Sequence, residues 1–318
     1  MPVLRIATRA SQLALWQANF VADSLRSLDP ELTVELVHVT TTGDRVQGEP
    51  LRQFGGQGVF TREVQAALLE GRADIAVHSL KDLPTVPTAG LELAAVPARA
   101  PVADALLLPT GHSGPASLAM LPRGARIGTG SPRRQAQLLR IRPDLVCSEV
   151  RGNLDTRIRK LDAGEYEGLI LAVAGLSRLG WSDRISLILA PPTMFPAAGQ
   201  GALGLECRHG DEATIRWVSQ LEDRQTRLAV DAERAVLRTL EAGCHAPVGT
   251  WASWKSPETL HLEAILIAPD GSETLAAASS MQGPLSQYGS GNALDAAHEL
   301  GANVAHLLLK QGASRYLV

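Results

Sequence analysis

The chain has 318 residues, 45% of them hydrophobic, so it can bury a full core, and its length is typical of two or three domains. Its net charge of -3 at pH 7 argues against nucleic acid or an anionic membrane as a partner, because both are polyanions. The cysteines (Cys147, Cys207 and Cys244) lie too far apart for a zinc or redox motif, which predicts a reduced, cytoplasmic protein without a metal site. Arg5 and Arg9 interrupt the first apolar run and no later run reaches membrane-spanning length, so we expect neither a signal peptide nor a transmembrane segment.

The first hundred residues alternate strands and helices. Residues 3–7 and 34–40 have the apolar pattern of strands and enclose a helix over 12–25 that Ser11 begins, which predicts a β-α-β unit with parallel strands. Five glycines within residues 42–58 predict an irregular loop, a candidate lid. A helix and two further strands are expected after that loop, at 61–69, from Ile75 and at 91–96.

Two proline-rich breaks, at 97–101 and 190–196, bracket a middle segment with its own alternation of elements. Strands are expected there near Ile127 and at 169–173, and helices at 133–139 and 154–161. Residues 202–207 read as a strand that returns to the first sheet, so the chain would cross between two domains twice.

The last hundred residues predict a smaller α+β unit, with a long helix over 221–240, three strands near Val248, Leu262 and Thr274, and a closing helix over 293–309. The fold class expected is therefore α/β, with two doubly wound domains, a cleft between them and a small C-terminal α+β domain. The predicted boundaries are 1–99 with 197–218 for the first domain, 100–196 for the second and 219–318 for the third.

A carboxylate stands where one buried strand ends. The apolar run 75–77 suits a strand covered on both faces, and Pro84 prevents the ladder from continuing past Leu83. Lys81 and Asp82 then lie at the carboxyl end of a strand, where ligands bind in open α/β sheets. An ordinary exposed turn would have the same sequence, so this segment alone leaves both interpretations open.

Three segments predict basic corners between a strand and a helix, where free backbone N–H groups and guanidinium groups bind anions. Residues 123–178 hold ten Arg and one Lys against six acidic residues, a local excess of five positive charges. No dinucleotide-binding glycine motif or Walker-type loop is present at these corners, which weighs against a nucleotide and favours another polyanionic ligand. The corners are Thr8-Arg9-Ala10-Ser11, Gly128-Thr129-Gly130-Ser131-Pro132-Arg133-Arg134, and Arg151-Gly152-Asn153 with Arg157.

Cys244 lies between Gly243, which would stop the preceding helix, and Pro247, so it is expected on a constrained loop. A thiol held on such a loop can act as a nucleophile, although a small buried residue is the ordinary alternative. His245 is an unsuitable general base for this thiol, because neighbours in the chain rarely point at one another.

Motifs spread over almost the whole chain, in the same order, resemble the porphobilinogen deaminase family, also called hydroxymethylbilane synthase. Several such motifs together are highly specific. They are Thr8-Arg-Ala-Ser-Gln-Leu-Ala-Leu, Val77-His-Ser-Leu-Lys-Asp-Leu-Pro, Gly128-Thr-Gly-Ser-Pro-Arg-Arg-Gln, Arg151-Gly-Asn, Leu171-Ala-Val-Ala-Gly-Leu, Pro196-Ala-Ala-Gly-Gln-Gly-Ala and Gly243-Cys-His-Ala-Pro-Val-Gly.

The resemblance implies three domains, the first two like periplasmic binding proteins. It also implies a monomeric transferase of haem and tetrapyrrole biosynthesis that joins four porphobilinogen molecules head to tail, loses ammonia at each step and releases hydroxymethylbilane. A dipyrromethane cofactor would be linked to Cys244 by a thioether. Every pyrrole ring carries an acetate and a propionate, so a growing chain needs many fixed positive charges. By resemblance the cofactor would contact Thr129, Ser131, Arg133, Arg134 and Lys81, and the substrate Arg9, Ser11, Arg151, Arg157 and Arg178.

Asp82 matches the catalytic carboxylate of the family. Loss of ammonia from the aminomethyl group leaves an electron-poor azafulvene, which a carboxylate beside the pyrrole N–H can stabilise while it handles the proton lost after coupling. Lys81 would act with it, because a nearby cation favours the ionised Asp.

Two positions depart from the family pattern. Gln57 stands where a lysine is common, so an electrostatic role of the 42–58 loop is in doubt. Gly130 stands where a hydroxyl residue is frequent, so one ligand contact is expected to be looser.

Two other classes of protein would share part of this sequence pattern. A two-domain binding protein would have the cleft and the arginines but would leave Cys244 unused, and it would normally carry an export signal. A cysteine hydrolase or acyltransferase would use Cys244 but needs a histidine base, and no histidine outside His245 lies in a suitable motif.

Overall fold

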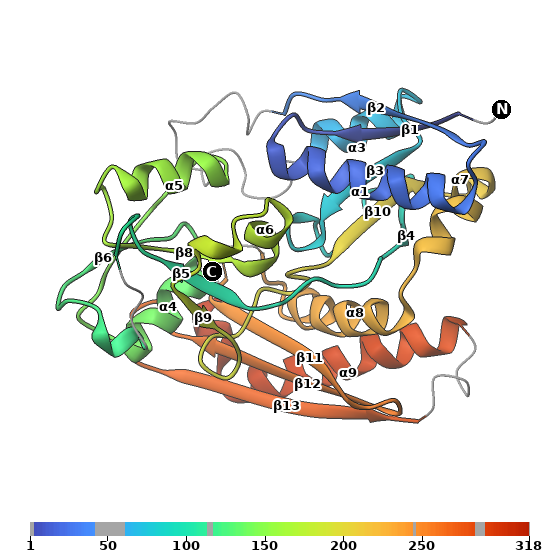
Figure 1. Cartoon of the computed structure of the whole chain (residues 1–318). Coiled ribbons are helices and arrows are strands. Elements are labelled where there is room, and N and C mark those ends of the chain that lie inside the picture. The colour runs from blue at the N-terminus through green and yellow to red at the C-terminus, as the bar shows by residue number, and fades with distance from the viewer. Residues whose placement is uncertain (1–2, 42–60, 113–116, 244–245, 284–289, 318) are drawn as a thin grey trace. The chain divides into compact units, whose positions relative to one another are not determined.

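The computed structural model describes residues 3–41, 61–112, 117–243, 246–283 and 290–317. Contacts within the chain divide it into two compact units, one of Met1–Ala100 with Gly201–Arg227 and one of Pro101–Gln200 with Leu228–Val318. The described residues form three sheets (Figure 1). The first sheet belongs to the first unit, and the other two belong to the second. The finer division at residues 99, 196 and 218 stays a prediction.

The sheet of the first unit has the strand order β2-β1-β3-β10-β4. Strand β1 is parallel to β2 and β3, as expected, but β10 is antiparallel to both of its neighbours, β3 and β4. The predicted return of the chain to this sheet is confirmed, and the returning strand runs antiparallel to its neighbours. The strands are β1 Val3–Thr8, β2 Thr33–His38, β3 Ile75–Ser79, β4 Leu91–Ala95 and β10 Leu203–Arg208.

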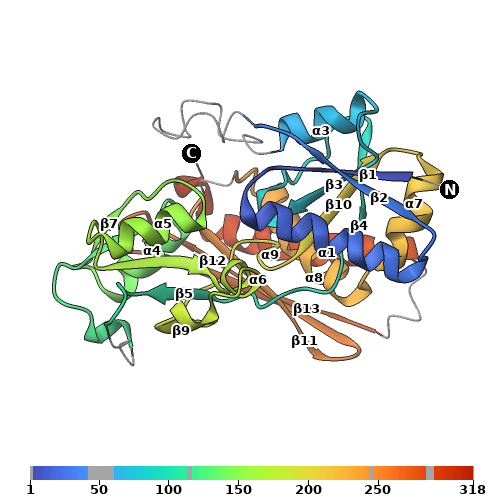
Figure 2. The same ribbon diagram turned by 45° about the horizontal axis from the view of Figure 1, so that its top comes forward.

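Helices cover both faces of this sheet. Helix α1 (Gln12–Leu28) lies along one face of the sheet (Figure 2). Its Val21 and Leu25 pack with strand residues that include Ile6 and Ile75. Helix α3 (Arg62–Leu69) packs Leu68 on the opposite face with Ala76. Alternate residues of β3 therefore belong to different cores, which explains why its sequence is an apolar run without alternation. Helix α7 is Glu212–Val218, and single helical turns occupy Leu80–Asp82 and Ser219–Leu221.

The first sheet of the second unit repeats this plan, with the order β7-β6-β8-β5-β9. Strand β6 is parallel to β7 and β8, and β5 is antiparallel to β8 and β9. Both α/β sheets thus have one antiparallel strand at the fourth position. The strands are β5 Asp104–Leu107, β6 Arg126–Gly128, β7 Val146–Ser148, β8 Gly168–Ala172 and β9 Leu187–Leu189.

Helices also cover both faces of this second sheet, as the doubly wound prediction requires. Helices α5 and α6 pack on one face with Leu169 and Leu171, and α4 packs on the other with Ile127 and Ile170. The helices are α4 Pro132–Ile141, α5 Leu154–Asp162 and α6 Val173–Arg178, with single turns at Leu118–Met120 and Ser182–Arg184.

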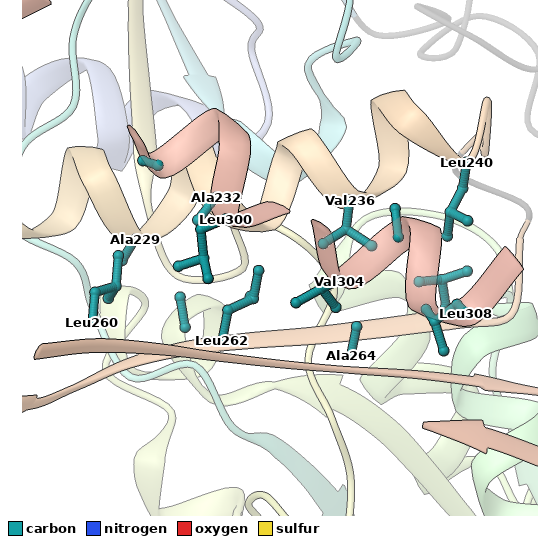
Figure 3. Packing of buried hydrophobic residues seen from close by; sticks show 14 of the residues in the cluster. Ala229, Ala232, Val236, Leu240, Leu260, Leu262, Ala264, Leu300, Val304 and Leu308 are labelled. Atoms are coloured by element: carbon teal, nitrogen blue, oxygen red, sulfur yellow. The ribbon is translucent and has the colours of Figure 1, made fainter. Parts of the chain in front are cut away.

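The C-terminal part is a three-stranded antiparallel sheet, β11-β12-β13, packed against two helices (Figure 3). Val236 of α8 and Val304 of α9 meet Leu262 of β12 in this core. Gly301 lets the helices approach closely, since a Cβ there would lie 2.3 Å from the carbonyl oxygen of Ala232. The predicted fold class, two α/β sheets covered by helices and a small C-terminal α+β part, is confirmed. The elements are α8 Arg224–Thr239, β11 Val248–Ser256, β12 Thr259–Ile267, β13 Thr274–Gln282 and α9 Ser290–Lys310, with a final turn at Ala313–Tyr316.

One ion cluster joins three strands of the first unit, at the sheet edge opposite to Asp82. Asp74 precedes β3 and accepts hydrogen bonds from Arg5 Nη2 at 2.9 Å and from Arg208 Nη2 at 3.0 Å. Burial alone would raise the pKa of the Asp74 carboxyl, but the hydrogen bonds from both arginines outweigh burial and hold that pKa below its ordinary value.

Replacing Asp74 by Asn is expected to lower the free energy of unfolding by about 1–3 kcal/mol at pH 7. Because the folded pKa of Asp74 is depressed, its contribution is complete above the unfolded pKa of about 4 and is lost as the pH falls through the folded value. Urea unfolding measured from pH 7 down to pH 3 gives the free energy of unfolding of both proteins. The difference between wild type and variant should stay constant at first and become smaller below about pH 4. A gap that widens toward acid would contradict this role.

Among the described residues, no helix combines the length and the apolar character needed to cross a bilayer.

Candidate functional site

The predicted corner between β1 and α1 forms as expected. Ser11 is the N-cap of α1, and its hydroxyl accepts a hydrogen bond from the Ala14 N–H at 3.4 Å. Thr8 closes the turn by donating to the Ala14 carbonyl at 3.1 Å. The first turn of α1 has no acidic residue, so its partial positive charge is not offset locally. Arg9, half-buried in this turn, adds a full positive charge.

Asp82 ends a single helical turn that follows β3 directly. The turn is fixed at its start, where the Leu80 N–H donates to the Ala202 carbonyl at 3.0 Å. Leu80 is fully buried, Lys81 is half-buried and Asp82 is exposed. The sequence therefore places a charged carboxylate in solvent on a turn held by a buried neighbour.

The two corners of the first unit lie at the same edge of its sheet. Strands β1 and β3 are parallel neighbours, so Arg9 and Ser11 follow one carboxyl end while Lys81 and Asp82 follow the next. This edge combines two basic side chains, a helix N-terminus and one exposed acid. It can bind a carboxylate-bearing ligand and transfer a proton beside it.

A buried polar network beneath this edge was not predicted. His78 Nε2 lies 3.1 Å from Glu206 Oε2, and Gln65 Nε2 lies 3.0 Å from each oxygen of Glu206. All three residues are buried, and they connect α3, β3 and β10. The signal available in the sequence was a polar residue inside an otherwise apolar strand, at His78 and again at Glu206.

The corner between β6 and α4 also forms as predicted. Ser131 is the N-cap, with its hydroxyl 3.5 Å from the Arg134 N–H, and Pro132 occupies the first helical turn. Thr129 accepts from the Ser131 N–H at 3.2 Å. Close packing explains why residue 128 is a glycine, because a Cβ there would lie 2.4 Å from Leu169 Cδ2.

Arg133 and Arg134, expected to face an anionic ligand, are almost fully buried at 4% and 6% exposure. Both donate to the carboxylate of Asp104, at 2.8 Å from Arg133 Nη2 and 2.7 Å from Arg134 Nη2. Sequence analysis did not single out Asp104, which opens β5 some thirty residues before its partners.

The remaining basic residues occupy other turns of this unit. Arg151 pairs with the Glu149 carboxylate, and Arg157 Nε donates to the Gly152 carbonyl at 2.8 Å. Burial lowers the pKa of the Arg178 guanidinium to about 10, which marks a cation removed from water. Because β6 is parallel to β7 and β8, the chain leaves all three strands at one edge and enters these basic segments.

Cys244 and Gln57 both lie outside the described residues, so their predicted roles stay predictions. Helix α8 ends at Thr239, and Glu241 takes a left-handed conformation with φ of 52°. The helix expected over 221–240 therefore ends one residue earlier than predicted, before Gly243 is reached. Strand β11 begins at Val248, soon after Cys244, and its Thr250 N–H donates to the Pro196 carbonyl at 2.9 Å.

Two family models match the chain. One, described as "Porphobilinogen deaminase, dipyromethane cofactor binding domain", covers residues 4–216, and one described as the porphobilinogen deaminase C-terminal domain covers 227–310. The porphobilinogen deaminase of Syntrophotalea carbinolica is 45% identical over 318 residues, which is 99% of this chain and 95% of that protein.

Solved structures with a similar backbone include two periplasmic proteins. The VFT2 domain of Bordetella pertussis BvgS has a TM-score of 0.43 and 15% identity, over 69% of this chain and 86% of that one. The arginine-binding protein STM4351 of Salmonella typhimurium has a TM-score of 0.40 and 12% identity, over 71% and 94%.

Proposed function

The chain belongs to the porphobilinogen deaminase family, and we propose that Asp82 and Lys81 are its catalytic residues and that its basic corners hold the carboxylates of cofactor and substrate. The enzyme is a transferase that joins four porphobilinogen molecules head to tail, releases ammonia at each step and yields hydroxymethylbilane. The observation that carries the proposed roles is the position of Asp82, an exposed carboxylate at the sheet edge that also presents Arg9 and Ser11.

The residues of the second unit suit a dipyrromethane group, which carries four carboxylates on two pyrrole rings. Arg133 and Arg134 share one Asp104 carboxylate, so one positive charge in this trio is left over. Arg133 Nε is a buried donor without a partner among the described residues. These are the features of a site that gains its last hydrogen bonds from an anionic ligand.

Thr129, Ser131, Arg133 and Arg134 would hold the acidic side chains of the cofactor together with Lys81, and Cys244 would form the thioether. The bound dipyrromethane supplies the free pyrrole carbon to which the first substrate unit is joined. Arg9, Ser11, Arg151, Arg157 and Arg178 would bind acetate and propionate groups of incoming and coupled units. Each guanidinium–carboxylate contact of this kind contributes about 1.5–3 kcal/mol when it is desolvated.

Asp82 performs the proton chemistry in this proposal. As the C–N bond of the substrate's protonated aminomethyl group breaks, the electron pair leaves with ammonia and positive charge spreads over the pyrrole ring to its N–H. The ionised carboxylate of Asp82 stabilises that charge. After the new carbon–carbon bond forms, the same carboxylate receives the proton lost from the attacking ring carbon. Lys81, the half-buried neighbour of Asp82 on the same turn, adds a positive charge beside the reacting groups.

Intact-mass measurement of the purified full chain tests the proposal. We expect added mass equal to two linked pyrrole units that survives denaturation, a colour with Ehrlich's reagent, and ammonia release when porphobilinogen is supplied. A non-catalytic binding protein or a cysteine hydrolase would give none of the three. The reduced thiol that the linkage needs agrees with a cytoplasmic enzyme, and we expect the loaded protein to be a monomer by light scattering.

A further inference from the structure

Asp104 lies in the second unit, at the end of its α/β sheet where the parallel strands stop. It is the first residue of β5, and because β5 runs antiparallel to β8, it pairs with Ala172, the last residue of β8. Its fully buried carboxylate therefore lies at the edge where the parallel strands of this sheet end. That is the edge from which the chain enters the corner at Thr129 and Ser131.

Four hydrogen bonds converge on this carboxylate. Oδ2 accepts from Arg133 Nη2 at 2.8 Å, and Oδ1 accepts from Arg134 Nε at 3.1 Å and Nη2 at 2.7 Å. Oδ1 also accepts from Gln200 Nε2 at 2.9 Å. The Asp104 carboxylate thus fixes both guanidinium groups and also the side chain of Gln200, which lies in the segment that follows Pro196.

Backbone carbonyls hold the outer nitrogens of the same arginines. Arg134 Nη1 donates to the Ile170 carbonyl at 3.0 Å, and Arg133 Nη1 donates to the Phe195 carbonyl. Gln137 clamps Phe195 in turn, donating to its carbonyl at 2.9 Å and accepting from its N–H at 2.7 Å. Each guanidinium is therefore oriented from more than one side, which removes the rotamer freedom that an arginine would otherwise lose on binding a ligand.

The charges of this trio are unequal. Two guanidinium groups and one carboxylate leave one positive charge, in a place where burial lowers the pKa of Arg133. A buried surplus cation is costly unless an anion joins it.

We propose that Asp104 is a positioning residue, which orients Arg133 and Arg134 and leaves one positive charge between them for a single carboxylate of the ligand. This inference rests on the proposed role of the two arginines in holding the dipyrromethane. Beyond that role, the inference names Asp104 as the group that orients the two arginines, and it states that together they bind one carboxylate of the ligand.

The test compares two carboxylates that each bridge two arginines. Asp104→Asn keeps the size of the side chain and removes its charge. Asp74→Asn does the same between Arg5 and Arg208 of the first unit, at the end of its sheet opposite to Asp82. We expect the fraction of full-length protein carrying the cofactor mass to fall about 10-fold or more in Asp104→Asn, since a charged hydrogen bond is lost at each arginine, and to stay at the wild-type level in Asp74→Asn.

A second readout separates orientation from general damage. Sulfate should raise the melting temperature of Asp104→Asn in a Cys244→Ser background more than that of Cys244→Ser alone, relative to chloride at equal ionic strength. Both proteins then lack the cofactor, and only the first has a trio with two uncompensated positive charges. Damage to the fold alone would weaken loading without a larger sulfate effect, and that outcome would overturn the proposal.

Asp104→Glu keeps the charge and moves it by one methylene, so it covers the case in which Asp104→Asn does not fold. We expect reduced loading and, in the Cys244→Ser background, a sulfate effect equal to that of Cys244→Ser alone. Full loading of the variant would contradict a positioning role. Arg133→Lys and Arg134→Lys test the proposed ligand-binding role of the arginines separately from the positioning role of Asp104. If they fail to load while the Asp104 variants load normally, the positioning role alone is wrong, and if they load fully, the proposed role of the arginines fails and the positioning role with it.

Discussion

Asp82→Asn is expected to lower kcat by about 100-fold or more while the protein keeps its fold and its cofactor. The amide has nearly the same shape as the carboxylate, but it carries no charge to oppose the electron-poor pyrrole and cannot accept the proton released after coupling. Because Asp82 is exposed on its turn, little stability depends on it. The measurements are initial rates of ammonia and bilane formation, the intact mass and the melting temperature.

Asp23→Asn is a suitable control, since it removes an exposed acid of α1 in the same unit that pairs only at the surface with Arg26. It should leave turnover unchanged. Asp82→Glu should recover part of the rate, because the charge returns with a displaced position. Turnover of Asp82→Asn within twofold of wild type would show that another group performs the proton transfer.

Local chemistry explains what the sequence could predict. Ser11 and Ser131 cap helices because a short hydroxyl side chain satisfies an N–H of the first turn, and that preference depends only on the next few residues. Pro84 limits the strand that begins at Ile75 for an equally local reason, although β3 already ends at Ser79, before the turn that carries Asp82. Such signals located the two corners and the acid correctly along the chain.

Long-range pairing explains what could not be predicted. Strands β7 and β9 have three residues each and β5 has four, too few for a period to emerge from the sequence. The antiparallel direction of β5 depends on its partners β8 and β9, which follow it by more than sixty residues. The position of Asp104 beside the arginines is a consequence of that direction, so only the fold revealed it.

Charge counting overstated the site in the second unit. The positive excess of residues 123–178 includes arginines that pair at the surface, such as Arg126 with Glu167 and Arg142 with Asp144. A count of residues does not distinguish an exposed arginine from a buried one. In the structure, Arg133 and Arg134 are buried, unlike these surface pairs. The motifs that carry the resemblance include Arg133 and Arg134 and leave out Arg126 and Arg142, because a motif records position as well as residue type.

Cys244→Ser is expected to abolish cofactor attachment and to reduce turnover by about 1000-fold or more. A thioether requires a sulfur nucleophile, and a serine hydroxyl ionises far less readily than a thiol, so it does not replace the thiolate in this reaction. The variant should show the mass of the bare chain after denaturation and no colour with Ehrlich's reagent. Its melting temperature should fall as well, because the basic corners would lack the anions that offset their charge.

The other thiols provide the matched control for Cys244→Ser. Burial raises the pKa of the Cys147 thiol to about 11 and, together with nearby acids, that of Cys207 to about 12. Both therefore stay protonated at neutral pH and are poor nucleophiles. Cys147→Ser should keep the full added mass and wild-type turnover. Added mass retained by Cys244→Ser, or located by peptide mapping on Cys147 or Cys207, would assign the attachment to another sulfur, and the loop that precedes β11 would lose its proposed role.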